Sequence, residues 1–211
     1  MTHRSHPDLL VLHALRLKGF ADPPAVSEAV ALDEPAVTER LMSFQERELV
    51  RRRDGRVSGF MLLPAGKELH AALLDADRAA ARCDAEIESA YAAFLAHNET
   101  FKQVCADWQL RTVGGRQVAN DHTDAAYDNA IAERLTRLQP DVALVLDDLA
   151  AAIERFAPYV WRLEDAATRF VAGDPAALAR PLARSYHDVW MELHEDFLVT
   201  LGRDRSVADG Y

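Results

Sequence analysis

The chain has 211 residues, of which 49% are hydrophobic and 27% charged, and its formal net charge at pH 7 is −10. This composition is that of an ordinary globular protein, and the length allows one large core or two smaller ones. The longest apolar runs are far shorter than the roughly 20 residues of a membrane-spanning helix, so we expect no membrane span and no membrane partner.

The acidity lies almost wholly in the second part of the chain. Residues 1–80 contain 11 Lys and Arg against 12 Asp and Glu, a balance of −1, whereas residues 81–211 contain 13 against 22, a balance of −9. A phosphate backbone responds to charge within a Debye length of about 8–10 Å. The net charge therefore does not exclude nucleic-acid binding by the first part of the chain.

The first residues, MTHRSHPDLL, lack the apolar stretch and the small-residue cleavage site of a signal peptide, which favours a cytoplasmic protein. The two cysteines, Cys83 and Cys105, have no CxxC spacing and fall at apolar positions of helical patterns. We expect both to be buried, reduced thiols.

Two short helices are predicted near the start of the chain. Residues 8–18 have the apolar pattern of a mostly buried helix, and Gly19 is expected to end it. Asp22 is the expected N-cap of the second helix, with Pro23 in its first turn, where the missing N–H costs nothing.

A third helix is predicted after Asp33, with Pro35 in its first turn. Val37, Leu41 and Phe44 recur at the spacing of one buried helical face. Two short helices joined by a turn form the helix-turn-helix arrangement, whose second helix enters a major groove roughly 12 Å wide. Burial of the apolar face would leave these residues outward: Ala36, Thr38, Glu39, Arg40 and Ser43.

A β-hairpin is predicted next, because Asp54-Gly55 is a turn dipeptide flanked by segments of strand character. Pro64 then begins another helix. Four arginines are expected near the tip of this hairpin: Arg51, Arg52, Arg53 and Arg56.

Residues 8–70 resemble the winged helix-turn-helix of MarR-type transcriptional regulators. The resemblance rests on the pattern AVTERL…F…ELV, on Asp54-x-Arg56 in the hairpin, and on LLPAGKEL, where family members tend to have LTPAGREL. It implies that residues 36–43 form a recognition helix and that Arg56 is a wing arginine reaching into the minor groove.

The resemblance covers about a third of the chain and has three departures. Glu48 stands where a glycine commonly ends the recognition helix, and Leu63 replaces the threonine before Pro-Ala-Gly. Few residues precede the first helix, whereas MarR proteins begin with a dimerisation helix.

A protein-interaction module is the alternative interpretation of this segment. A three-helix unit with a hairpin also serves that role, and Glu34, Glu39, Glu46 and Glu48 weaken the field that attracts phosphate, although a carboxylate can accept from cytosine N4. On the DNA-binding interpretation, the residues expected to contact DNA are Ala36, Thr38, Glu39, Arg40, Ser43, Arg51, Arg53 and Arg56.

From Pro64 the pattern changes to a heptad seam. No Gly or Pro interrupts it between Gly66 and Asn98, so we predict one long helix from Pro64 to about Ala96 that joins two domains. The residues of the seam are Leu69, Leu73, Ala76, Ala80, Cys83, Ile87, Ala90 and Phe94.

The rest of the chain is predicted to be helical, without a strand beyond residue 64. Residues 111–123 form a loop with Gly114-Gly115, and Gly173-Asp174-Pro175 forms a turn. Residues 203–211 are polar and expected to be loose. The predicted helices are residues 98–110, 124–138, 140–157, 159–172 and 176–201.

The helical part has no phosphate-binding glycine loop, no HExxH, no G-x-S-x-G and no zinc spacing, so we expect neither an enzyme nor a cofactor. An effector site is conceivable, because aromatic walls with a few polar anchors suit small molecules. The same aromatic residues could simply be core, and the loop arginine could simply pair with a carboxylate. The candidate effector-binding residues are Trp108, Arg111, Trp161, His187, Trp190 and His194.

A metal site is not expected. His187 and His194 are seven residues apart, about 10 Å along a helix, which is too far for them to share one ion as adjacent ligands. The helical effector domains of GntR-type regulators bind a metal through Asp and His, but no ligand motif here matches theirs.

The sequence thus predicts a mainly α protein with a winged helix-turn-helix at residues 1–68 and an all-α dimerisation and effector domain at residues 69–211. The predicted function is a cytoplasmic, homodimeric regulator that binds a double-stranded DNA operator and senses a small molecule. The alternative is an adaptor that binds protein rather than DNA, and an enzyme built on the helical domain is a third hypothesis.

Overall fold

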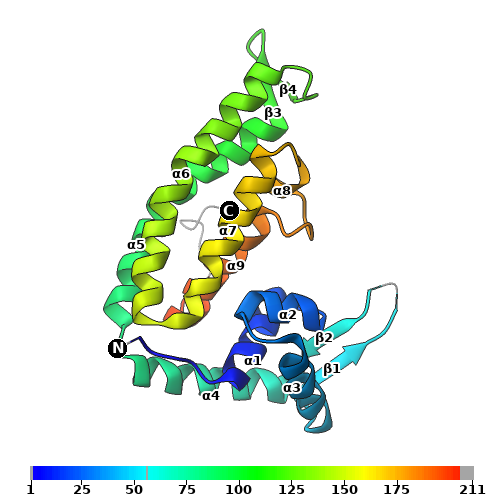
Figure 1. Cartoon of the computed structure of the whole chain (residues 1–211), viewed down its shortest axis with the longest axis vertical. Coiled ribbons are helices and arrows are strands. Elements are labelled where there is room, and N and C mark those ends of the chain that lie inside the picture. The colour runs from blue at the N-terminus through cyan, green and yellow to red at the C-terminus, as the bar shows by residue number, and fades with distance from the viewer. Residues whose placement is uncertain (1, 56, 205–211) are drawn as a thin grey trace.

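The computed structural model describes residues 2–55 and 57–204. The described chain is mainly helical and contains two small antiparallel sheets of two strands each. Figure 1 shows two groups of elements: a lower group that holds the first helices and one hairpin, and an upper, elongated group of longer helices. The predicted wing residue Arg56 and most of the predicted loose tail lie outside the described residues.

The lower group, which we call the N-terminal module, is built from short helices whose ends follow local signals. Gly19 adopts φ 70° after the first helix, and the Asp22 carboxylate accepts a hydrogen bond from the N–H of Ala25 in the second. Both predictions are confirmed. The elements of the module are α1 (Pro7–Lys18), α2 (Pro23–Val30), α3 (Glu34–Glu46), β1 (Val50–Arg53), β2 (Gly59–Leu62) and α4 (Pro64–Ala81).

α3 ends in a Schellman motif. The N–H of Leu49 bonds the carbonyl of Phe44 at 2.8 Å, and the N–H of Glu48 bonds that of Gln45 at 3.0 Å. The motif needs a left-handed residue, and Glu48 adopts φ 55° there. The chain thus keeps the turn that a glycine commonly makes, but with a residue that the left-handed conformation disfavours.

The predicted hairpin is present, although residues 54–58 make a longer connection than a two-residue turn. β2 also bonds back to the module through Ala21 and Phe60, which exchange backbone hydrogen bonds of 3.1 and 2.8 Å. Gly66 explains part of the LLPAGKEL motif: a Cβ at this position would lie 2.0 Å from the carbonyl oxygen of Leu49. Only glycine lets α4 approach the start of β1 this closely.

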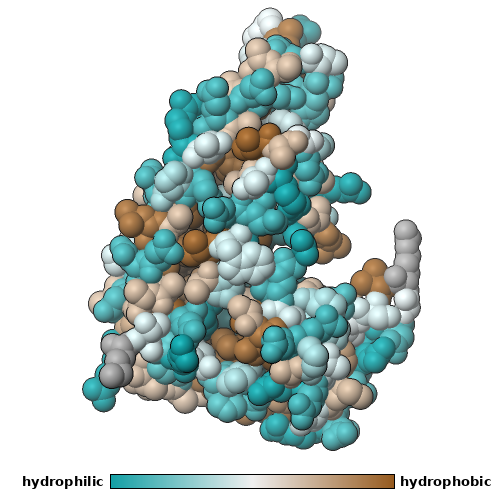
Figure 2. Space-filling view, in the orientation of Figure 1, coloured by the Kyte–Doolittle hydropathy of each residue, from teal (hydrophilic) through white to brown (hydrophobic). Residues whose placement is uncertain are grey.

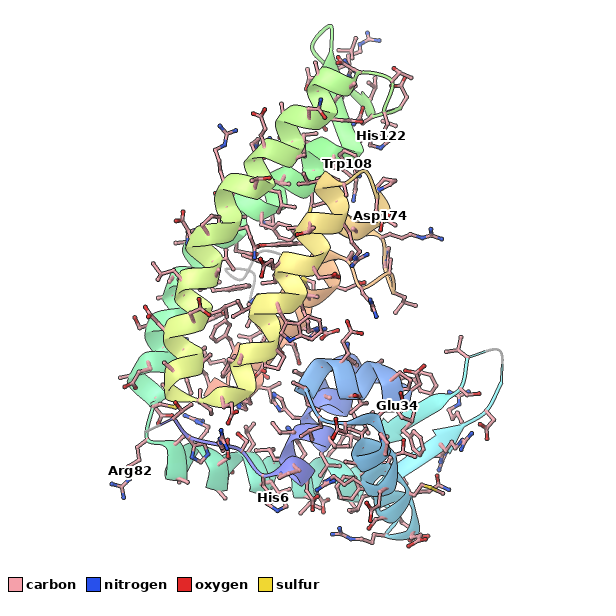
Figure 3. All side chains as sticks on the ribbon, viewed as in Figure 1. His6, Glu34, Arg82, Trp108, His122 and Asp174 are labelled. Carbon is pink, nitrogen blue, oxygen red and sulfur yellow. The ribbon has the colours of Figure 1, made fainter. Side chains whose placement is uncertain are left out.

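The prediction of one long helix from Pro64 to Ala96 is wrong. α4 ends at Ala81, Arg82 adopts the left-handed φ of 53°, and the next helix begins at Asp84. The break lets Cys83 turn into the core of the upper group. Figure 3 shows the Arg82 side chain pointing outward at this junction.

The heptad seam holds on α4 only for Leu69 and Leu73, which are half-buried against the module core. The buried face of α4 consists of Gly66, His70, Leu74 and Asp77, whereas the predicted seam residues Ala76 and Ala80 are exposed. Both faces have helical spacing, and tertiary packing selects the one that carries polar groups. The second half of the seam is confirmed, since its residues are buried: Cys83, Ile87, Ala90 and Phe94.

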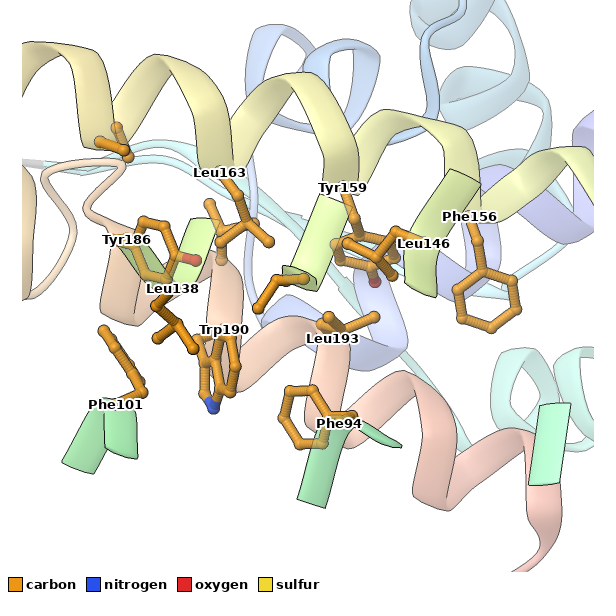
Figure 4. Close-up of a cluster of buried hydrophobic side chains, with 14 of the residues drawn as sticks. Phe94, Phe101, Leu138, Leu146, Phe156, Tyr159, Leu163, Tyr186, Trp190 and Leu193 are labelled. Atoms are coloured by element: carbon orange, nitrogen blue, oxygen red, sulfur yellow. The ribbon is translucent and has the colours of Figure 1, made fainter. Parts of the chain in front are cut away.

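The upper group, which we call the C-terminal bundle, packs α5 against α6, α6 against α7 and α7 against α9. Its core holds aromatic rings packed on one another, among them Phe94, Phe101 and Trp190 (Figure 4). Its elements are α5 (Asp84–Gln109), β3 (Leu110–Val113), β4 (Arg116–Ala119), α6 (Ala125–Ala152), η1 (Glu154–Phe156), α7 (Ala157–Val171), α8 (Ala176–Ala179) and α9 (Tyr186–Leu201).

The prediction of no strand beyond residue 64 is wrong, because β3 and β4 form a second hairpin. Gly114 and Gly115 have φ of 56° and 78° at its two-residue turn, as a type I′ turn requires. The Gly-Gly pair is therefore the turn of a hairpin, and the prediction of a loop over residues 111–123 is wrong.

Three helix boundaries are also wrong. α5 runs without a break from Asp84 to Gln109, so the boundary predicted between Ala96 and Asn98 is absent. Pro140 lies inside α6 instead of starting a helix, because Leu138 and Val142 on either side of it are both buried in the bundle core. The predicted helix 176–201 is interrupted between α8 and α9, where Pro181 lies and Leu182 and Arg184 have positive φ. A proline costs a helix interior about 3 kcal/mol, and continuous packing offsets this cost only in α6.

Nearly all of the described buried apolar residues belong to two clusters, one in each group. The first extends from Val11 to Leu62, with Leu69 and Leu73 packed against it, and the second begins at Cys83. Within the part of the chain that the structure describes, no helix combines the length and the apolarity needed to cross a membrane.

Candidate functional site

The outward face of α3 is accessible. Glu39, Met42 and Ser43 are exposed, and Thr38 is half-buried beside them. Val37, Leu41 and Phe44 occupy the opposite face, inside the module core, as predicted. The end of the molecule that carries α3 is largely hydrophilic in Figure 2, whereas apolar patches interrupt the surface of the bundle.

This face is acidic at its centre. Glu34, Glu39 and Glu46 line a shallow depression around Met42, whose side chain is 58% exposed. Ala36 is half-buried. Arg40 turns back on the module, since one of its terminal nitrogens donates to the carbonyl of Ala36 at 2.9 Å and its Nε lies 3.4 Å from Asp8. The positive charge of Arg40 is therefore partly neutralised.

Arginines supply positive charge beside this face. Arg51, Arg52 and Arg53 are all exposed on β1. Arg52 donates from Nε to Asp54 at 2.9 Å and lies over the Phe60 ring, so it is held against the hairpin. Among the hairpin residues that the structure describes, Arg51 and Arg53 have side chains available to a phosphate.

A polar contact zone between the two groups was missed by sequence reasoning. At its centre, Arg155 donates to the Asp196 carboxylate at 2.5 Å, and Tyr159 donates to the other oxygen at 3.0 Å. His13 lies 3.0 Å from Asp196 and shares a hydrogen bond of 2.9 Å with His70. We call this zone the inter-module seam; its residues are His13, Arg16, Lys18, His70, Arg155, Tyr159, Arg162, Glu192, Glu195 and Asp196.

The seam joins α1 and α4 of the module to η1, α7 and α9 of the bundle. Around its buried centre, Arg16 pairs with Glu195 at 3.1 Å, and Lys18 pairs with Glu192. Arg162 on α7 donates to the same Glu192 carboxylate at 2.5 Å. α9 is therefore the helix through which the bundle holds α1.

Burial perturbs two ionisable groups of the seam in defined directions. Burial raises the pKa of the Asp196 carboxyl, but Arg155 and His13 outweigh it and hold the pKa well below its ordinary value. Burial lowers the pKa of His70 to about 3, assisted by the charges of His13 and Arg16. Asp196 is thus ionised and His70 neutral at physiological pH.

Three of the six candidate effector residues come together. His187, Trp190 and His194 line one groove between α5 and α9. Trp190 is buried, and its indole N–H donates to Asn98 at 2.9 Å.

The other three candidates lie elsewhere. Trp108 packs against His122 (Figure 3) and makes an edge-to-face contact with Phe170, and Trp161 is 43% exposed on α7. Arg111 pairs with Asp124 at 3.1 Å. This contact favours the interpretation that the arginine pairs with a carboxylate over the interpretation that it binds an effector.

Both cysteines are free thiols, as expected. Cys83 is buried as predicted, but Cys105 is only half-buried, and it lines the groove. Burial raises the pKa of Cys105 to about 12, so its thiol stays protonated and behaves as a small apolar group. Among residues 2–55 and 57–204, no three His, Cys, Asp or Glu side chains are arranged to hold a metal ion.

Comparisons of the chain with protein-family models, with curated proteins and with solved structures found no match. The functional argument therefore depends on the contacts, charges and exposed faces of this chain.

Proposed function

We propose that the chain is a dimeric regulator of transcription whose N-terminal module is a MarR-like winged helix-turn-helix. On this proposal α3 is the recognition helix, and the β1–β2 hairpin is the wing. The observation that carries the proposal is the arrangement in Figure 1, where α3 and the hairpin lie together at the end of the module away from the bundle. A duplex can approach this end without displacing the bundle.

The hairpin and α3 differ in charge, so we expect them to contact different parts of the DNA. Arg51 and Arg53 would neutralise phosphates, a contribution that is independent of sequence. Glu39 and Ser43 would face base edges, where a carboxylate accepts from the N4 amino group of cytosine. The acidic face of α3 repels phosphate, so binding would depend on a correctly matched groove.

A dimer follows from the small size of one module. A single winged helix covers little DNA, whereas two modules on half-sites about 34 Å apart combine their contacts. The bundle would provide the dimer contact, which makes it the dimerisation and effector half of the protein.

An adaptor that binds a protein remains the second candidate. The exposed Met42 among Glu34, Glu39 and Glu46 favours it, because an apolar side chain ringed by carboxylates suits a basic partner.

The test is selection of duplexes from a random library by the full chain, followed by titration of the best duplex at several salt concentrations. We expect enrichment of a two-fold repeated site and an affinity that falls steeply with salt. Replacing both Arg51 and Arg53 by alanine should reduce the salt slope by about 2, since each phosphate contact contributes about 0.9.

Arg82→Ala is the matched control, since Arg82 is an exposed arginine at the far end of α4. It should leave the salt slope unchanged. Failure to enrich any duplex would reject the DNA-binding proposal in favour of the adaptor. An unchanged slope in the double variant would reject the hairpin as a phosphate contact.

A further inference from the structure

The groove between α5 and α9 has the size of a small-molecule site. Its cavity volume is about 430 Å³, within the range of roughly 300–1,000 Å³ that such sites occupy. α5 contributes Phe101, Lys102 and Cys105, and α9 contributes Trp190 and Met191. The groove opens along the junction at which α5 and α9 close the bundle.

The floor of the groove is apolar and aromatic. The Phe101 and Trp190 rings pack with centroids 4.7 Å apart. The polar edge of Trp190 is bonded to Asn98, and both rings are only 1% exposed, so they form the buried base beneath the groove. Met191 adds a thioether, which adapts to ligands of irregular shape. The protonated Cys105 thiol adds no charge.

The charge of the groove is unlike that of the chain as a whole. The chain has 34 acidic and 24 basic residues, yet none of the described residues lining the groove is acidic. Lys102 supplies a positive charge at the rim. Its ammonium pairs with Glu99 at 3.1 Å, but both side chains are substantially exposed, and such a pair contributes little. An anionic ligand can therefore compete for Lys102.

We propose that this groove binds a small amphiphilic molecule with an apolar, ring-sized body and a single negative charge. The body lies against Cys105, Ala106 and Met191, above the buried rings of Phe101 and Trp190, and the anionic group lies at Lys102. A cationic ligand finds no carboxylate among the described lining residues. The proposal that the groove binds such a ligand depends only on these contacts. The regulatory effect of the ligand depends in addition on the proposed function.

That consequence follows from the position of α9. His187 and Met191 line this groove and also a second groove between α9 and the N-terminal module, where Leu17 and Phe20 form the other wall. Glu192, the residue directly after Met191 on α9, pairs with Lys18 of α1. A ligand that favours one position of α9 therefore changes how the module is held, by as much as its affinity differs between the two positions.

The direct test uses the full chain and 8-anilinonaphthalene-1-sulfonate, a fluorescent aromatic monoanion, with uncharged N-phenyl-1-naphthylamine as the neutral comparison. We expect saturable binding of the anion. Ala106→Trp fills the groove from its exposed rim and should weaken binding at least tenfold, the effect of losing about 1.4 kcal/mol.

Ala92→Trp is the matched control, because Ala92 is exposed on the same helix but does not line the groove. It should bind the dye as the wild type does, and both variants should retain the wild-type far-ultraviolet circular dichroism. Equal loss in the two variants, or equal retention, would overturn the proposed site.

The charge requirement has its own pair of variants. Lys102→Glu should weaken the anionic dye about fivefold, and the neutral dye much less, because only the anion loses the ammonium. Lys67→Glu, an exposed lysine on α4, should affect neither dye. Equal loss for the two dyes would overturn the role of Lys102.

The same titration separates this proposal from the regulator proposal. Dye binding by a chain that selects no duplex would reject the regulator and leave the site standing. Absence of saturable dye binding in a chain that selects a duplex would reject the site and leave the regulator standing.

Discussion

The N-terminal module and the C-terminal bundle each have an apolar core, but the surface along which they meet is polar. The cores hold residues such as Leu41 and Phe44 in the module and Phe101 and Trp190 in the bundle, all at most 1% exposed. The seam between them is centred on the ion pair of Arg155 and Asp196. Apolar burial therefore stabilises each half, and directional polar contacts fix the angle between the halves.

Apolar packing and buried ion pairs differ in how much displacement of the contacting groups they tolerate. Apolar packing gains free energy in proportion to the area buried and accepts small shifts. A buried ion pair recovers its desolvation cost only when its geometry is kept. We therefore expect the seam to add little net stability but to allow few relative positions of the two halves.

Removal of the seam's central carboxylate should have the largest effect. Asp196→Ala leaves the Arg155 guanidinium buried without its counterion, which should lower the free energy of unfolding by about 3–5 kcal/mol. Urea denaturation measures this loss. The matched control is Glu154→Gln, which breaks the exposed pair of Glu154 with Arg4 at 2.7 Å and should cost under about 0.5 kcal/mol.

Asp196→Ala should also uncouple the two halves. Trp108, Trp161 and Trp190 all belong to the bundle, so tryptophan fluorescence reports on the bundle, whereas far-ultraviolet circular dichroism reports on both halves. The two unfolding curves should coincide in the wild type and separate in the variant. Coincident curves in the variant, or equal losses for Asp196→Ala and Glu154→Gln, would contradict the role given to the seam.

Acid should weaken the seam before it weakens either core. The folded pKa of His70 is about 3, below the unfolded value of about 6.5. Between these values the unfolded chain binds the extra proton, so the stability from His70 is complete above pH 6.5 and falls as the pH drops. We expect a loss of about 2 kcal/mol from this group between pH 7 and pH 5.

His70→Gln removes this titration. It should reduce the slope of the unfolding free energy against pH by up to the contribution of one bound proton. His97→Gln, a half-buried histidine of α5 outside the seam, is the control and should keep the wild-type slope. The depressed pKa of Asp196 acts in a lower window, below its unfolded pKa of about 3.9. A slope that His70→Gln leaves unchanged above pH 5 would place the acid sensitivity elsewhere.

The module was predictable because its boundaries have local causes. Asp22, Pro23 and Gly19 act within a few residues of their own position, and the buried spacing of Val37 and Leu41 is visible along one helix. The length of the hairpin connection and the close approach at Gly59 to Ala21 were not predicted. They depend on chain segments far apart in sequence.

The bundle was predicted less well, because distant packing decides its boundaries. Nothing local distinguishes Pro140, which α6 tolerates, from a proline that starts a helix. The break at Arg82 arises because Cys83 belongs to the bundle core. For the candidate site, the α3 face and the hairpin arginines were predicted, but the seam was not, since His13 and His70 meet across 57 residues. Such pairing has no periodic signal.

The smallest predicted effect concerns a local feature, the left-handed residue that ends α3. Glu48 is exposed and adopts φ 55° at the end of α3, a conformation that costs a residue with a Cβ about 1 kcal/mol relative to glycine. Glu48→Gly should therefore stabilise the chain by about 1 kcal/mol and raise the midpoint of thermal unfolding by roughly 2–4 °C.

Glu48→Gln separates backbone strain from charge, because glutamine keeps the Cβ and removes the carboxylate. We expect the midpoint of Glu48→Gln to stay within about 1 °C of the wild type, because an exposed surface charge contributes little. If glutamine stabilised the chain as much as glycine does, repulsion by the neighbouring acidic residues would be the cause, and the left-handed turn would carry no strain. A gain from glycine alone locates the strain in the Schellman turn that ends the proposed recognition helix.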